Sequence, residues 1–243
     1  MAEEKKDPEE FPQFATALII SAHPDDPDFG AAGTLARLVE GGAKVTIVIC
    51  TDGSEGGEDP SIPDADLSRQ RYAEQCAAAK ELGIDDVVFL GHPDGRLEPT
   101  IEFRKEVTAL LRRHRPELVL THMPAIDINT PIGGYHPDHL AVGQATLAAV
   151  YPAARNPRAF RELLAEGLEP WRVKEVWIPS WNLGDYFVDI SSTVDRKIAA
   201  LRRHESQFQN WENWEQNLLD RMKQIGEKSG YEYAEGFKRI KIG

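Results

Sequence analysis

Short apolar runs alternate with segments of helical periodicity from residue 15 to residue 151. Ala15–Ala22 and Lys44–Cys50 have the length and apolar character of buried strands, and Ala31–Glu40 between them repeats its apolar residues at helical spacing. The pattern continues as helix, strand, helix, strand and helix at Leu67–Leu82, Val87–Leu90, Ile101–Arg113, Leu118–His122 and Asp138–Tyr151. Strands that alternate with helices of this length predict an α/β fold, with a mostly parallel sheet and helices on both faces.

The pattern becomes less regular toward the C-terminus. Val173–Pro179 and Tyr186–Ile190 are interpreted as later strands. Val194–Phe208 and Trp211–Glu227 have helical character, so the fold is expected to end in a C-terminal helical extension.

The chain has 243 residues, a length that one hydrophobic core usually serves. No segment has the composition of a domain linker, so residues 15–243 are predicted to form a single domain. The start of the chain, MAEEKKDPEE, is charged and contains proline. Residues 1–14 are therefore expected to form a mobile acidic arm outside that domain.

The charge balance limits the classes of partner. The chain has 28 Lys and Arg against 40 Asp and Glu, and this net charge of −12 would repel nucleic-acid phosphates and anionic lipid headgroups. No apolar stretch approaches the roughly 20 residues of a bilayer-spanning helix, and no secretory signal pattern is seen. Cys50 and Cys76 are too few for a disulfide framework. The sequence predicts a cytoplasmic protein that neither inserts into membranes nor binds nucleic acid.

Residues that commonly bind metals lie where predicted strands end. His23–Asp26 (HPDD) follows the first strand, and His136–His139 (HPDH) opens a helix after the fourth. Because the carboxyl ends of parallel strands form the ligand crevice of an open sheet, we expect these two motifs to converge. A third His-Pro-Asp, His92–Asp94, also follows a strand, and there Pro-Asp-Gly is itself a turn signal.

The two motifs contain residue types that serve as ligands in catalytic zinc sites. Such sites use three imidazole or carboxylate ligands and leave one position for water, and His23, Asp26 and His139 would supply the three. Asp25 and His136 then remain for proton transfer and oxyanion stabilisation, the chemistry of amide or ester hydrolysis. Spacing alone does not decide which carboxylate is the ligand and which is the base, and Fe²⁺ can take the same ligands as Zn²⁺.

Other functions are consistent with parts of this pattern. A single His-Pro-Asp is more often a polar turn, and a non-catalytic sugar- or nucleotide-binding module on the same sheet would need no metal. A metal-dependent esterase or phosphoesterase also fits, but no Arg/Lys cluster accompanies the motifs to hold a phosphate. No dinucleotide fingerprint, Walker A sequence or GxSxG elbow is present.

The sequence also resembles the LmbE-like/PIG-L family of zinc-dependent N-deacetylases. The resemblance lies in AHPDD at Ala22–Asp26, AGTL at Ala32–Leu35, TDGSEG at Thr51–Gly56 and HPDH at His136–His139. Further similar positions are Arg71 and Glu74 before Leu82-Gly83, Leu90–Gly95, Lys197, His204–Gln207 and Ala234–Phe237. The resemblance extends from residue 15 onward.

This resemblance implies a Rossmann-like sheet and a set of roles for the motif residues. One zinc ion would be bound by the residues that match the family's ligands, His23, Asp26 and His139. Asp25 would be the general base, and His136 would stabilise the oxyanion.

The resemblance further implies a hydrolase that removes the N-acetyl group from an N-acetylglucosamine-type glycoside, a small sugar conjugate. An amidase for a thiol conjugate or another non-sugar amide is the alternative. Arg71 and Asp94 would face the substrate sugar, although a surface ion pair and a turn cap are their ordinary structural roles. Many members carry Glu directly after HPDD, whereas this chain has Pro27, so the role of that Glu is not carried over.

The five tryptophans lie in the second half of the chain, at Trp171, Trp177, Trp181, Trp211 and Trp214. Aromatic faces suit sugar rings, but tryptophan is equally suited to packing the C-terminal helices or an interface between the subunits of a homo-oligomer. None of the five is assigned to the site.

Overall fold

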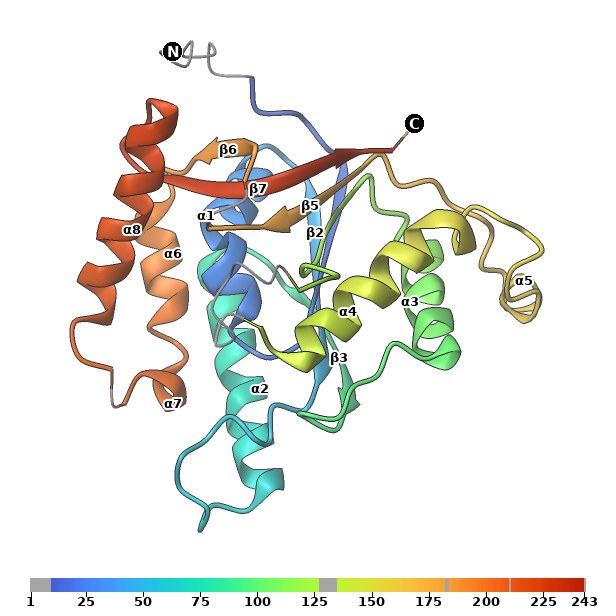
Figure 1. Cartoon of the computed structure of the whole chain (residues 1–243), viewed down its shortest axis with the longest axis horizontal. Coiled ribbons are helices and arrows are strands. Elements are labelled where there is room, and N and C mark those ends of the chain that lie inside the picture. Colours follow the sequence, from blue (N-terminus) through green and yellow to red (C-terminus); the bar gives the residue numbers. More distant parts are fainter. Residues whose placement is uncertain (1–9, 127–134, 182–183, 210, 243) are drawn as a thin grey trace.

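The computed structural model describes residues 10–126, 135–181, 184–209 and 211–242 (Figure 1). In these residues seven strands form one sheet in the order β3-β2-β1-β4-β5-β7-β6. The strands are β1 (Thr16–Ser21), β2 (Lys44–Thr51), β3 (Asp86–His92), β4 (Leu118–Leu120), β5 (Glu175–Pro179), β6 (Tyr186–Asp189) and β7 (Ala234–Lys241). The neighbours from β3 to β5 pair in parallel, and β7 runs antiparallel to β5 and β6. The predicted α/β fold is confirmed.

Helices cover both faces of this sheet, as Figure 1 shows. They are α1 (Asp26–Glu40), α2 (Asp64–Glu81), α3 (Ile101–His114), α4 (Pro137–Ala148), the π-helical turn η2 (Ala149–Ala153), α5 (Glu162–Ala165), α6 (Val194–Leu201), α7 (Glu205–Phe208) and α8 (Trp214–Ser229). Apolar residues of α1, α2, α6 and α8 form one core, and those of α3 and α4 form the other. Successive residues of β1 alternate between the two, because side chains of a strand point to opposite faces.

The C-terminal part differs in detail from the expectation. The helical stretch predicted over 194–208 is divided into α6 and α7, and the last predicted helix begins at Trp214. After α8 the chain returns to the sheet as β7, which lies between β5 and β6. The sequence pattern left this strand unassigned.

A buried ion pair ties β7 and α6 to α1. The ammonium of Lys197 lies 2.6 Å from Glu235 Oε1 and donates to the carbonyl of Phe29 at 2.7 Å. The Glu235 carboxylate accepts the backbone N–H groups of Gly33 (3.1 Å) and Thr34 (2.8 Å). In a regular helix the N–H of Gly33 donates to the carbonyl of Phe29. Here that N–H also binds Glu235, and that carbonyl also binds Lys197.

Trp177 is fully buried in the core. Phe11 and Phe14 pack against it edge-on, with ring centroids 6.2 Å and 5.7 Å away. The expected mobile arm over residues 1–14 falls mainly on residues 1–9, which lie outside the described residues.

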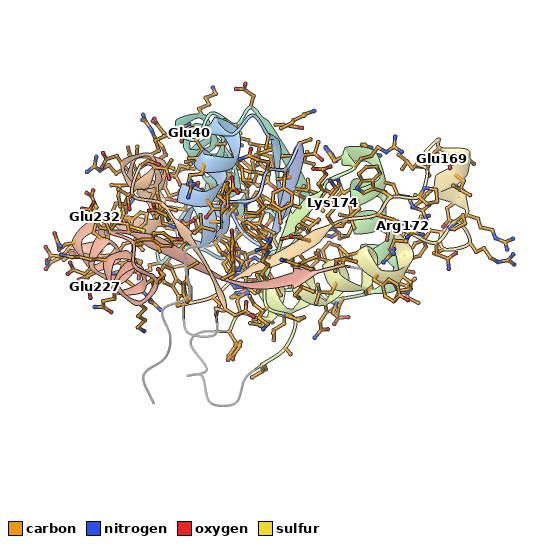
Figure 2. The ribbon with its side chains drawn as sticks, turned by 90° about the horizontal axis from the view of Figure 1, so that it is seen from above. Glu40, Glu169, Arg172, Lys174, Glu227 and Glu232 are labelled. Atoms are coloured by element: carbon orange, nitrogen blue, oxygen red, sulfur yellow. The ribbon has the colours of Figure 1, made fainter. Side chains whose placement is uncertain are left out.

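Charged side chains lie around the periphery of the molecule. Figure 2 shows Glu227 and Glu232 at the end formed by α8, and Glu169 and Arg172 at the opposite end; all four are exposed. Within the part of the chain that the structure describes, no helix is both long enough and apolar enough to cross a bilayer.

Candidate active site

A cavity of about 440 Å³ lies at the carboxyl ends of the parallel strands. The loops that leave β1, β2 and β3 and the first turn of α4 meet there, which is where open parallel sheets form their ligand crevice. Its lining residues are His23, Asp25, Asp26, Glu55, Gly56, Arg71, Asp94, Tyr135, His136 and His139. The structure thus brings all seven residues singled out from the sequence to one cavity.

Three of these side chains point their ligand atoms at one another. His23 Nδ1 lies 3.2 Å from His139 Nε2 and 3.4 Å from Asp26 Oδ2. His139 Nε2 lies 3.1 Å from Asp26 Oδ1. Ligands at about 2.0–2.1 Å from a tetrahedral zinc ion are about 3.3 Å from one another, so these separations fit a metal ion. Two imidazoles and a carboxylate are also the donor types of catalytic zinc sites.

The other nitrogen of His23 is held by two carboxylates. His23 Nε2 lies 3.2 Å from Asp138 Oδ2 and 3.0 Å from Asp94 Oδ1. Metal-binding histidines commonly donate their second ring N–H to a carboxylate, which fixes the orientation of the ring. Burial alone would lower the pKa of His23, but hydrogen bonds to Asp138, Asp26 and Asp94 raise it to about 12. The negative potential of these three carboxylates also favours a bound cation.

A second group, His23, Asp94 and His136, also brings three ligand atoms together. The two groups share His23, whose Nδ1 faces His139 and Asp26 and whose Nε2 faces Asp94. Donor atoms that could bind a metal therefore lie on both sides of the His23 ring.

His122 and Asp138 belong to this site but were missed from the sequence. The ring of His122 stacks on that of His139, with centroids 4.0 Å apart and planes 10° apart. Its Nε2 accepts the backbone N–H of Ala22 at 3.0 Å, and burial lowers its pKa to about 4. Asp138 is buried, and its carboxylate accepts the N–H groups of Gly95 and Leu97 at 2.8 Å and 3.0 Å. Position was the available signal, since His122 follows β4 and Asp138 lies inside HPDH.

Asp25 lines the cavity beside the metal group in a constrained conformation. Its φ of 98° is unusual for a residue with a side chain, and such strain persists only where the surroundings fix it. Its N–H donates to Gln75 Oε1 at 2.9 Å, and Arg71 Nη2 lies 3.3 Å from its carboxylate. Burial raises the pKa of Asp25 to about 6, against the lowering effect of Arg71.

Arg71 is itself almost fully buried at the wall of the cavity. It donates from Nη1 to the carbonyl of Gly53 and from Nη2 to that of Pro24, both at 2.8 Å. These bonds join the loop after β2 to the turn that carries Asp25. The arrangement positions the Asp25 carboxylate whether or not Arg71 also contacts a ligand.

His136 is the N-cap of α4, where its Nδ1 accepts the backbone N–H of Asp138. Burial and the neighbouring His23 and His139 lower the pKa of His136. A neutral ring that accepts at Nδ1 carries its proton on Nε2, so His136 can donate a hydrogen bond from that atom.

The His and the Asp of the third His-Pro-Asp motif, His92–Asp94, lie in two different cavities. His92 Nε2 lies 2.7 Å from Glu106 Oε2 of α3, and His92 lines a different cavity. Asp94 of the same motif faces the metal group and holds His23. Position at a strand end is common to both residues, and only Asp94, which the family resemblance singled out, lines the candidate site.

Behind Asp25, His204 and Asp28 form a buried pair. His204 Nε2 lies 2.9 Å from Asp28 Oδ2, which also accepts from Gln75 Nε2 at 2.9 Å. Burial lowers the pKa of His204, but the hydrogen bond and charge of Asp28 outweigh it, and the net pKa is raised. The pair is thus linked through Gln75 to the backbone of Asp25.

This raised pKa predicts a pH-dependent stability. Folding raises the pKa of His204 above its unfolded value of about 6.5. The stabilisation that protonated His204 gives the folded state is therefore complete below pH 6.5 and is lost as the pH rises through the folded pKa. In urea unfolding, the difference in unfolding free energy between wild type and His204→Gln should shrink as the pH rises. The total decrease is about 1.4 kcal/mol for each unit by which folding raises the pKa of His204.

His114→Gln provides a control of opposite sign. Burial lowers the pKa of His114, so its neutral form is favoured by folding and the difference from wild type should grow as pH rises. A difference for His204→Gln that stays constant or grows with pH would contradict the assignment of a charged His204.

Comparison with known proteins gives consistent matches. Residues 18–150 match the sequence model of the PIG-L family, described as GlcNAc-PI de-N-acetylase. The chain is 36% identical over 234 residues to diacetylchitobiose deacetylase of Thermococcus kodakarensis, over 96% of this chain and 85% of that protein. It is 34% identical over 192 residues to 1D-myo-inositol 2-acetamido-2-deoxy-alpha-D-glucopyranoside deacetylase of Streptomyces avermitilis, over 68% of this chain and 60% of that protein.

A solved structure shows the same fold. The structure of N,N'-diacetylchitobiose deacetylase from Pyrococcus horikoshii, in complex with its inhibitor MPG, superposes with a TM-score of 0.86 at 31% identity. The match covers 94% of this chain and 84% of that one.

Proposed function

The chain belongs to the PIG-L family of de-N-acetylases, and from this we propose that it hydrolyses the acetamide of an N-acetylglucosamine-type glycoside. The observation that carries the proposal is the convergence of the two motifs in one cavity. A ligand group of two imidazoles and one carboxylate lies there with a further carboxylate, Asp25, and a further imidazole, His136. A binding module would not require this set of groups at one place.

His23, Asp26 and His139 are proposed to hold one Zn²⁺, and Fe²⁺ would fit the same donors. A divalent ion held there supplies a Lewis acid and lowers the pKa of water toward about 7. Asp138 and Asp94 would keep the ring of His23 oriented for this ligand set, as their distances to Nε2 support.

Asp25 is proposed to act as the general base. Its carboxylate lines the cavity beside the ligand group, and a pKa of about 6 leaves it ionised at neutral pH yet able to take a proton. It would accept the proton of the attacking water and pass it to the departing amine. Arg71 and Gln75 would hold it in place, since both bind its turn.

His136 is proposed to donate from Nε2 to the oxygen of the scissile acetamide as negative charge develops on it. The cap bond at Nδ1, which fixes the ring at the start of α4, supports this role. Arg71 and Asp94 are proposed to contact the substrate sugar, because both line the same cavity. The substrate would be a small N-acetylated sugar conjugate, and the enzyme would act in the cytoplasm.

The test is acetate release by the purified, zinc-loaded protein. N-Acetylglucosamine and N,N'-diacetylchitobiose should each yield acetate and a free amine in equal amounts. The alternative activity is hydrolysis of a thiol conjugate. An amide of N-acetylcysteine with an amine that is not a sugar tests this alternative. Acetate from the conjugate and from neither sugar would overturn the sugar assignment, and acetate from none of the three would overturn the proposed function.

A further inference from the structure

The two imidazoles of the proposed metal group are held in different ways. On His23, the nitrogen that faces away from the group, Nε2, lies 3.0 Å from Asp94 Oδ1 and 3.2 Å from Asp138 Oδ2. His139 presents Nε2 to the group, and its Nδ1 has no hydrogen-bond partner among the residues that the structure describes. Metal-binding histidines are commonly oriented by a hydrogen bond at the second ring nitrogen, so His139 lacks the usual support.

A parallel ring stack supports His139 instead. The ring of His122 lies face to face with the ring of His139, with centroids 4.0 Å apart and planes 10° apart. The rings of His23 and His136 are tilted against His139 by 48° and 45°, and their centroids are 5.2 Å and 5.4 Å away. A flat contact such as that of His122 restricts the rotation of the His139 ring, and this rotation sets the direction in which His139 Nε2 points.

His122 also contacts the rest of the ligand group. Because β4 pairs in parallel with β1, the residue that follows β4 closely emerges beside the HPDD motif that follows β1. Nε2 of His122 accepts the backbone N–H of Ala22, the residue before His23, at 3.0 Å, and lies 3.3 Å from Asp26 Oδ2. The side chain of His122 is 17% exposed, so little space is left for it to move. One side chain thus touches two of the three proposed ligands and the residue next to the third.

We propose that His122 is a positioning residue of the metal centre, whose ring fixes the orientation of His139 for metal binding. This rests on the proposed function, since it assumes a divalent ion held by His23, Asp26 and His139. His122 is outside the described lining of the catalytic cavity, so it would act through His139 and not on the substrate. Its ring would hold this ligand ready before the ion arrives. Loss of the ring should therefore weaken metal binding more than it weakens the fold.

The test measures the affinity of the protein for Zn²⁺ alone, by competition with a chromogenic chelator, and the urea unfolding of the metal-free protein. His122→Gln keeps an acceptor for the N–H of Ala22 but loses the ring. Its Kd for Zn²⁺ should rise about 10- to 100-fold, the usual effect of losing a group that orients a metal ligand, with little change in unfolding. His122→Phe keeps the ring and loses the acceptor. It should bind Zn²⁺ within about threefold of wild type, although the unpaired N–H of Ala22 should lower the free energy of unfolding.

Two further variants complete the comparison. His122→Leu lacks both the ring and the acceptor, and should bind Zn²⁺ about as weakly as His122→Gln. The pair of His122→Leu and His122→Phe therefore tests the ring even if His122→Gln does not fold. His114→Gln is the matched control, because it makes the same chemical change beside Thr46 and Asp86, near the amino ends of β2 and β3. It should leave the Kd for Zn²⁺ unchanged.

Two results would overturn the inference. A Kd for Zn²⁺ within about threefold of wild type in His122→Gln or His122→Leu would show that the ring does not orient His139. A Kd in His122→Phe as high as that in His122→Leu would assign the effect to the contacts of Nε2 and not to the stack. Failure of the proposed function is a separate result. A wild type that binds Zn²⁺ but releases acetate from no sugar would contradict the deacetylase and leave this inference standing, whereas a wild type that binds no Zn²⁺ would overturn both.

Discussion

Replacing Asp25 by Asn is expected to lower kcat by about 100- to 10,000-fold, the usual contribution of a general base. Asparagine keeps the size of the side chain and the backbone bond to Gln75, but its amide cannot take a proton from water at neutral pH. The metal should stay bound, since the proposed ligands are His23, Asp26 and His139. Steady-state acetate release and the metal content of the same preparation, by elemental mass spectrometry, check both parts.

Asp85→Asn is the control variant for Asp25→Asn, and two outcomes would contradict the role proposed for Asp25. Asp85→Asn makes the same chemical change at an exposed position next to the amino end of β3, and should leave turnover and metal content intact. Full turnover in Asp25→Asn would overturn the base assignment. Loss of metal from Asp25→Asn would instead make Asp25 a ligand, the alternative that spacing left open.

His139→Ala is expected to reduce bound metal from about one ion per chain to near zero and to abolish acetate release, because it removes one of three ligands. The imidazole Nε2 of His139 lies 3.2 Å from His23 Nδ1 and 3.1 Å from Asp26 Oδ1, so its removal leaves two members of this ligand set. Metal content after incubation with zinc and removal of the excess measures the effect.

His92→Ala is the control for this change. His92 belongs to the third His-Pro-Asp motif but pairs with Glu106 in another cavity, so its removal should leave both metal and activity. If the wild type and His139→Ala both failed to hold metal after zinc was supplied, the metal-dependent mechanism would be wrong.

The place of the site could be predicted from the sequence because strand ends are easy to recognise. Each run of apolar residues that stops at a polar motif marks the end of a parallel strand, and all such ends meet at one edge. The roles within the site were harder to predict. The position of His122 after β4 and of Asp138 inside HPDH places both near the site, but their roles depend on the direction in which each side chain points, which the sequence does not show.

The strand β7 illustrates a second limit. Its sequence, AEGFKRIK, mixes small, charged and apolar residues, and its first four residues are buried whereas the last four are exposed or half-buried. Pairing with β5 and β6 satisfies the backbone hydrogen-bonding groups of β7, and both partner strands are remote from it in sequence. Strand formation there depends on tertiary contacts more than on local pattern.

The ion pair between Lys197 and Glu235 has a consequence for how the enzyme is made. Glu235 binds the N–H of Gly33, a residue 202 positions earlier, inside the helix whose first turn carries Asp26. On the ribosome, α1 and the proposed metal ligand Asp26 emerge long before the carboxylate that supports the helix. Until β7 has been synthesised and added to the sheet, a nascent chain has the HPDD and HPDH motifs but not the supported helix. We therefore expect stable metal uptake to follow the addition of β7 to the sheet.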